Sequence, residues 1–305
     1  MRCCKSEDAA KVNPCVVLIG TMSERASSHM TSAIHSDLVP RQLTTGVGAP
    51  VLVVDFVPLS AGASLSSLLG AKSRGHPVYA IDPVSDLVQV REYLREYLSV
   101  ADMAAAYAEG FVDAHPRVFV VGYCSAAPLA LHIARILAVG RDVSVALVRP
   151  VWPDEGEIAS EFAALRKGLG VGDSLRLGSL CVDAKGDPEQ ALAEMTEILH
   201  GDLVSMATSR GLDASSAVLI ELLNRYRAWL AFLLAGQHAG PVGRTAIDVY
   251  TGTGTNTGTT PDAISPEFGL ETCRFNRLPI LDQEPFATPE LVDLLLVQFE
   301  AEEPT

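Results

Sequence analysis

The chain has 305 residues, of which 48% are hydrophobic, and a formal net charge of −14. This composition suffices for one large α/β domain or two small ones and excludes disorder over the whole chain. The negative charge opposes binding to phosphate backbones and anionic lipid, so we expect no nucleic acid and no membrane among the partners.

The first residues carry charges where a signal peptide needs an apolar segment, and no apolar run has the roughly 20 residues that span a bilayer.

The six cysteines are scattered and follow no zinc-site or CxxC spacing. They indicate free thiols in a reducing, cytoplasmic environment. We expect neither a metal nor a cofactor. The cysteines are Cys3, Cys4, Cys15, Cys124, Cys181 and Cys273.

The first half of the sequence alternates strand and helix patterns. A short strand-like run at 14–20 precedes apolar, β-branched strands, which are typical of a sheet buried on both faces. Helical spacing follows three of these strands, and this order predicts a parallel sheet with right-handed crossovers. The predicted strands are 49–59, 76–83, 117–122 and 142–153; the predicted helices are a short one before 72, one at 89–116 and one at 128–140.

The second half is mostly helical. Residues from about 154 to about 215 read as a helical insertion with one short strand at 179–184, and Asp187 and Pro188 mark a helix start. A long apolar helix at 217–236, a strand at 244–252, a polar loop at 251–269 and a closing helix at 290–300 follow. We divide the chain into a partly disordered extension, 1–36, and one domain, 37–305.

The strongest local pattern is Gly122-Tyr123-Cys124-Ser125-Ala126-Ala127, between a predicted strand and a predicted helix. A nucleophile elbow needs this context, because the turn is so sharp that the residues two before and two after the nucleophile must be small. Positive potential at the helix N-terminus would stabilise a thiolate. The alternative is an ordinary strand-to-helix turn with a buried structural cysteine.

Several segments resemble the thioesterases of the α/β-hydrolase family, which act on acyl and peptidyl chains of polyketide and nonribosomal peptide carrier proteins. The similar segments begin near Asp37 and cover almost the rest of the chain. The resemblance implies an α/β-hydrolase fold, with a mostly parallel central sheet, helices on both faces and a helical lid. It also implies a carrier protein with a phosphopantetheine-bound substrate as the partner. These segments are "DLVPRQLTTGVGAPVLVVDFVPLSAG", "HPVYAIDP", "GYCSAAPLALHIARIL", "VALVRPVWP", "ELLNRYRAWLAFL" and "LPILDQEPFATPELVDLLL".

The resemblance places the nucleophile at Cys124, where the family has serine. It implies two oxyanion donors. One is the backbone N–H of Ser125, and the other is the backbone N–H of Leu59 or Ser60, the two residues that follow Pro58.

The other two positions of the catalytic triad depart from the family. The acid position falls at Pro150, so Asp154 could serve only if the loop folds back. The base position falls at Gln283, or at Asp282 at most, and glutamine accepts no proton at a useful pH. Of the histidines, His200 and His238 are the best candidates for a recruited base, because a lid can reach over a site.

Three functions remain open on this reading. Because a cysteine is partly ionised near neutral pH, Cys124 could accept an acyl group without a base, which favours acyl transfer over hydrolysis. Alternatively, the empty acid and base positions fit a degenerate, non-catalytic binding partner of an assembly-line enzyme. The third function is ordinary thioester hydrolysis with a recruited histidine.

Overall fold

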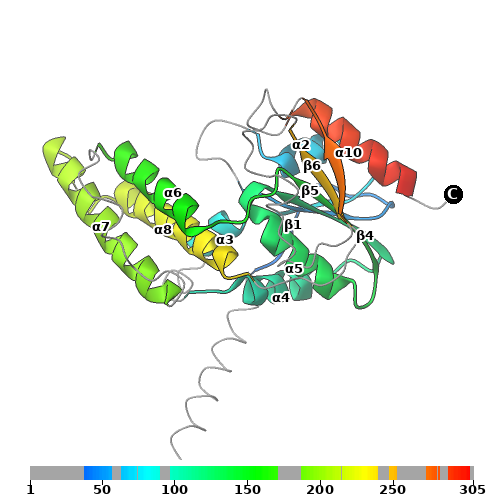
Figure 1. Ribbon diagram of the computed structural model, residues 1–305, viewed down its shortest axis with the longest axis horizontal. Coiled ribbons are helices and arrows are strands. Elements are labelled where there is room, and N and C mark those ends of the chain that lie inside the picture. Colours follow the sequence, from blue (N-terminus) through cyan, green and yellow to red (C-terminus); the bar gives the residue numbers. More distant parts are fainter. Residues whose placement is uncertain are drawn as a thin grey trace, which may run out of the picture.

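A seven-stranded sheet forms the centre of the protein, seen in the computed structural model (Figure 1). The strand order is β1-β3-β2-β4-β5-β6-β7, and every pair is parallel except β1 with β3. The strands are β1 (Arg41–Gln42), β2 (Val51–Val54), β3 (Val78–Ile81), β4 (Arg117–Tyr123), β5 (Asp142–Val148), β6 (Ile247–Thr251) and β7 (Cys273–Arg277). The structure describes residues 38–56, 63–73, 75–89, 97–170, 187–213, 215–239, 247–252, 273–279, 281 and 288–302.

Helices cover both faces of this sheet. In Figure 1, α2 and α10 lie on one face, and α4 and α5 lie on the other. The helices are α2 (Leu65–Lys72), α3 (Pro83–Gln89), α4 (Val100–Gly110), α5 (Ala127–Leu137), α6 (Glu155–Gly168), α7 (Pro188–Ser209), α8 (Ala217–Gln237) and α10 (Pro289–Glu302), with a short 3-10 helix, η1 (Cys124–Ala126), before α5.

The side chains on the two faces of the central strands belong to two separate hydrophobic cores. In β4, Val118 and Val120 pack with α4 and α5, whereas Phe119 and Val121 pack with α2 and α10. Successive side chains of a strand point to opposite faces, so a strand covered on both faces is apolar at every position. This packing accounts for the continuous apolar runs of the sequence.

Helices α6, α7 and α8 form a third core and extend away from the sheet (Figure 1). The ring of Trp229 in α8 meets Phe56 edge-on, with 4.9 Å between the ring centroids, and its indole N–H donates to Glu161 of α6 at 3.2 Å. Trp229 therefore joins the core formed by α6, α7 and α8 to the end of β2.

The structure confirms β2 to β6 and the predicted helices that correspond to α2, α5, α7, α8 and α10, and it departs from the sequence predictions at two places. The single helix predicted at 89–116 is wrong: α3 already begins at Pro83, and α4 begins only after Ser99, whose hydroxyl accepts the Asp102 N–H at 3.2 Å. The edge strands β1 and β7 were not predicted, because their half-exposed polar residues lack an apolar pattern.

Other sequence predictions lie outside the described residues: the extension 1–36, the short strands at 14–20 and 179–184, and the polar loop from 253 onward. No helix among the described residues is long and apolar enough to span a membrane.

A buried carboxylate fastens the β6–β7 edge of the sheet to α10. Asp248, 7% exposed, accepts hydrogen bonds from Arg274 at 2.5 and 2.9 Å, from Gln298 at 2.6 Å and from Asn276 at 3.3 Å. Because the Asp248 carboxylate links β6, β7 and α10, its loss should weaken the contacts among all three elements.

We predict that Asp248→Ala lowers the free energy of unfolding by about 1–3 kcal/mol, the usual range for hydrogen bonds to a charged group. Arg274 is largely exposed and stays solvated, which keeps the loss below that of a fully buried pair. Asp293→Ala, which removes the exposed Lys72–Asp293 pair, is the matched control and should cost about 1 kcal/mol or less. Urea unfolding of both variants measures the difference; equal losses would contradict the prediction.

Candidate functional site

The turn between β4 and α5 has the geometry of a nucleophile elbow. Cys124, the first residue after β4, has a φ of 52°, a left-handed conformation that non-glycine residues seldom adopt. The chain then passes through η1 directly into α5, near whose start Pro128 lies. Strained conformations of this kind persist where surrounding structure enforces them, and they concentrate at functional sites.

Close packing behind the turn enforces that conformation. A Cβ atom on Gly122 would lie 2.7 Å from the Cβ of Ala130 and 3.0 Å from a methyl of Leu147. The first distance is shorter than Cβ atoms tolerate and the second is tighter than most Cβ contacts, so β4 approaches α5 this closely because residue 122 is glycine. Ala126 and Ala127, fully buried, keep the other side of the turn small.

The Cys124 sulfur is half-buried and lies 3.8 Å from the Ser125 hydroxyl. Burial raises the pKa of the thiol, while hydrogen bonds from the Ser125 hydroxyl and backbone N–H, and the positive charge of Arg149, lower it. The carboxylate of Glu157, in the first turn of α6, raises it further. The resting group is therefore mainly a protonated thiol, and its reactivity depends on how well these donors stabilise the thiolate.

Three further ionisable groups lie around the elbow, and the sequence patterns indicated none of them. Asp55 follows β2, Tyr123 ends β4 and Arg149 follows β5, at the carboxyl ends of three neighbouring parallel strands. Ligands of open α/β sheets bind at this edge. Tyr123 directly follows the strand predicted at 117–122, whereas Asp55 and Arg149 lie inside the strands predicted at 49–59 and 142–153, where a charged residue in an apolar run was the available signal.

Asp55 is 2% exposed, and one carboxylate oxygen accepts the Ser66 N–H at the start of α2, at 2.7 Å. Burial raises the pKa of this carboxyl to about 7. Tyr123 packs into the α2–α10 core, and burial followed by the neighbouring Cys124 raises the pKa of its phenol to about 12. The Tyr123 phenol is therefore protonated near neutral pH, whereas the Asp55 carboxyl changes between its neutral and charged forms there.

The structure places the other predicted residues as follows. Pro150 is buried at the end of β5, beside Arg149, and offers no carboxylate there. The exposed side chain of Asp154 accepts the Glu157 N–H at 2.8 Å and so caps α6; its role as catalytic acid stays a prediction. The predicted oxyanion donor Leu59 and its alternative Ser60, and the base positions Gln283 and Asp282, lie outside the described residues.

The histidines are scattered over the fold. His76 and His115 lie at the amino ends of β3 and β4, opposite the elbow, and His132 is buried in α5. His200 is exposed on α7, and His238 is exposed at the end of α8. Among the described residues, the hydrogen bonds of the Cys124 sulfur involve Ser125 and no histidine.

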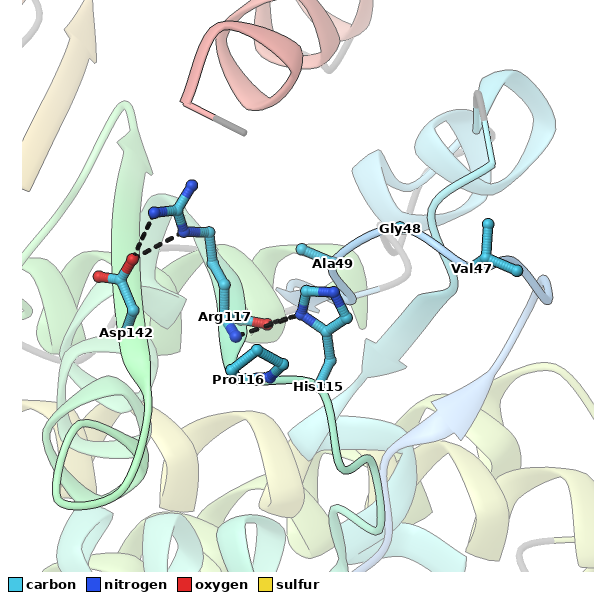
Figure 2. A pocket seen from close by; sticks show the side chains of 7 residues that line it. All are labelled: Val47, Gly48, Ala49, His115, Pro116, Arg117 and Asp142. Atoms are coloured by element: carbon cyan, nitrogen blue, oxygen red, sulfur yellow. Dashed lines mark hydrogen bonds and ion pairs between the residues drawn. The ribbon is translucent and has the colours of Figure 1, made fainter. Parts of the chain in front are cut away.

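A pocket of about 590 Å³ lies at the opposite, amino edge of the sheet (Figure 2). Arg117 and Asp142, which begin β4 and β5, form an ion pair at 2.6 Å there, and the His115 ring accepts the Arg117 backbone N–H at 3.1 Å. Its polar groups are thus already paired, and the whole sheet separates the pocket from Cys124. Within the described part of the chain, no group of three histidine, cysteine or carboxylate side chains could hold a metal ion.

Comparisons with known proteins support the fold. No family model matches the sequence, and neither does any curated protein. Among solved structures, the chain resembles the four-domain nonribosomal peptide synthetase AB3403, bound to AMP and glycine, with a TM-score of 0.53 and 15% identity. The match covers 87% of this chain but 20% of that one. The chain has the α/β-hydrolase fold.

Two further structures of lower similarity also match. One is a protein assigned to the α/β hydrolase family from Desulfitobacterium hafniense, with 14% identity, a TM-score of 0.47 and coverage of 82% of this chain and 96% of that one. The other is the Vlm2 thioesterase domain with a bound dodecadepsipeptide, with 15% identity, a TM-score of 0.46 and coverage of 84% and 96%.

The tight contact behind the elbow gives a first prediction for the site. Gly122→Ala should lower the free energy of unfolding by about 1–3 kcal/mol, because the added methyl pushes β4 and α5 apart. Gly201→Ala is the control, since Gly201 lies in α7 with open space around it, and the added methyl should stabilise that helix by about 0.5–1 kcal/mol. Chemical denaturation compares the two; a neutral Gly122→Ala would contradict the packing argument.

The buried Asp55 carboxyl gives a second prediction, on the pH dependence of stability. Its pKa is about 7 in the folded protein and 3.8 ordinarily, so the folded state binds the proton more tightly, and wild-type stability falls as pH rises between these values. Asp55→Asn removes this penalty while still accepting the Ser66 N–H.

The variant should therefore gain stability relative to wild type across this window and level off above about pH 7, at no more than about 4 kcal/mol. Urea unfolding at several pH values measures the difference. A difference that does not change with pH would show that the Asp55 carboxyl is not held neutral by burial.

Proposed function

We propose that this protein takes an acyl or peptidyl group from a carrier-protein thioester onto Cys124 and passes it to an acceptor. The observation that carries the proposal is the left-handed backbone of Cys124, held between β4 and α5 by the packing at Gly122. A structural cysteine needs no strained turn, whereas a nucleophile needs one that exposes its side chain at the edge of the sheet. The family resemblance of the sequence supplies the substrate class.

The chemistry of the first step suits a thiol that has no imidazole partner among the residues that the structure describes. The Cys124 thiolate attacks the thioester carbonyl, the carbon–sulfur bond to the carrier breaks, and the departing thiolate takes up the proton that Cys124 lost. One thioester replaces another, so the step is nearly isoenergetic. The Ser125 N–H, which already faces the sulfur, is the proposed oxyanion donor.

The second step favours transfer over hydrolysis. Water must lose a proton as it attacks the acyl-enzyme, and Pro150 offers no carboxylate where the family has its acid. Amine or thiol acceptors are stronger nucleophiles than water and depend less on a base. We therefore propose that the acyl-enzyme is long-lived in water and is released by such an acceptor.

Intact mass spectrometry of the protein mixed with acyl-pantetheine or an acylated carrier protein tests the proposal. Wild type should gain one acyl group, mapped to Cys124, and Cys124→Ala should gain none there. Cys124→Ser should also remain unmodified, because a serine hydroxyl stays protonated without a base. An unacylated wild type that nevertheless binds the carrier, equally well as Cys124→Ala, would overturn the proposal in favour of a non-catalytic binding partner.

Hydrolysis with a recruited base has its own signature. In that case the carrier would be deacylated without a persistent adduct, and replacing His200 or His238 singly by alanine would abolish the turnover. We expect neither effect, since both histidines are exposed and the hydrogen bonds of the Cys124 sulfur, within the described residues, go to Ser125.

A further inference from the structure

Arg149 lies next to Cys124 at the carboxyl edge of the sheet. Strands β4 and β5 are parallel neighbours, and their last paired residues are Tyr123 and Val148. The next residue of each strand is Cys124 and Arg149, so the register itself places the guanidinium-bearing residue beside the nucleophile. Arg149 is half-buried, and its charge acts on both the Cys124 thiol and the Tyr123 phenol.

The backbone of Arg149 is strained in the same way as that of Cys124. Its φ is 47°, and these two are the non-glycine residues with positive φ in the described part of the chain. Hydrogen bonds on both sides hold the segment: the Arg149 N–H donates to the Tyr250 carbonyl at 2.8 Å, and the Val151 N–H donates to the Cys124 carbonyl at 3.2 Å.

This conformation is one that glycine or asparagine adopts most easily, so an arginine there is not explained by backbone preference. A connection between β5 and α6 needs no positive charge at this position. The side chain is therefore the feature that distinguishes Arg149, and the thiol at the end of the neighbouring strand is among the groups on which its charge acts.

We propose that Arg149 is the electrostatic partner of Cys124, a positioning residue whose guanidinium stabilises the thiolate, beside which the described residues place no imidazole. This inference rests on the proposed acyl transfer for its role in turnover. In the exchange step, the same charge would stabilise first the Cys124 thiolate and then the departing pantetheine thiolate, until that sulfur regains the proton. The guanidinium stays charged throughout and neither gives nor takes a proton.

Other charges reach the thiol as well. Glu157 of α6 opposes Arg149, and Asp55 after β2 acts on Tyr123, which in turn adjoins Cys124. Removing the guanidinium leaves burial and Glu157, which raise the pKa of the thiol, opposed only by the hydrogen bonds from Ser125, which lower it. Helices α5 and α8 also pack against the elbow, and their titratable side chains are His132, Arg135, Glu221, Arg225, Tyr226 and Arg227.

The test is the pH dependence of Cys124 alkylation by iodoacetamide in the full-length protein, followed by mass spectrometry of the Cys124 peptide. Arg149→Gln should shift the titration of the thiol upward and slow alkylation near neutral pH by about tenfold, the effect of roughly one pKa unit. Arg149→Lys should restore most of the rate. Arg117→Gln, at the opposite edge of the sheet, should match wild type.

Arg149→Gly keeps the proposal testable if Arg149→Gln folds poorly, because glycine accepts the left-handed backbone. It should fold at least as stably as wild type and yet show the same upward shift of the thiol titration. An unchanged alkylation profile in the Gln and Gly variants would overturn the pairing of Arg149 with Cys124.

Alkylation needs no acyl substrate, so this result is independent of the acyl-transfer proposal. If wild type fails to accept an acyl group but Arg149→Gln still shifts the titration, the acyl-transfer proposal fails and the electrostatic pairing stands. If both hold, Arg149→Gln should also slow acylation by acyl-pantetheine, by a factor similar to that for alkylation.

Discussion

The contact between Gly122 and Ala130 is the constraint on which the rest of the site depends. It lets β4 and α5 meet so closely that the chain must turn sharply between them, and Cys124 adopts its left-handed conformation in that turn. The position of the sulfur, the direction of the Ser125 N–H and the placement of the α5 N-terminus all follow from this turn. A larger side chain at residue 122 would change each of them at once.

The parallel sheet adds a second constraint, because it brings the carboxyl ends of neighbouring strands to one edge. Asp55, Cys124 and Arg149 follow β2, β4 and β5, and so lie in a row although they are far apart in the sequence. Burial raises the pKa of the Asp55 carboxyl to about 7, while Arg149 supplies positive charge next to the thiol. The surroundings of Cys124 therefore differ from those of a serine nucleophile that an imidazole activates.

The parts of the fold that could be predicted are those buried on both sides. Strands β2 to β6 are apolar at nearly every position because each face carries its own core, and α5 is apolar almost all round. Strand β7 was missed because its pairing depends on β6 and on the partners of Asp248, not on an apolar pattern of its own. The start of α4 depends on the Ser99 hydroxyl that caps it. The apolar residues before and after Ser99 keep a helical spacing, so the sequence pattern does not show that a new helix begins there.

The sequence by itself determined the fold class and the position of Cys124, because both depend on local order: apolar runs of strand length, and small residues around one turn. It also places a proline, Pro150, where the family resemblance of the sequence would put a catalytic acid. Only the tertiary structure decided what surrounds the sulfur. The charge of Arg149 acts on Cys124 from the neighbouring strand, and the charge of Glu157 acts on it from the helical insertion. Both effects depend on which segments are neighbours in space, which the spacing of residues along the chain does not indicate.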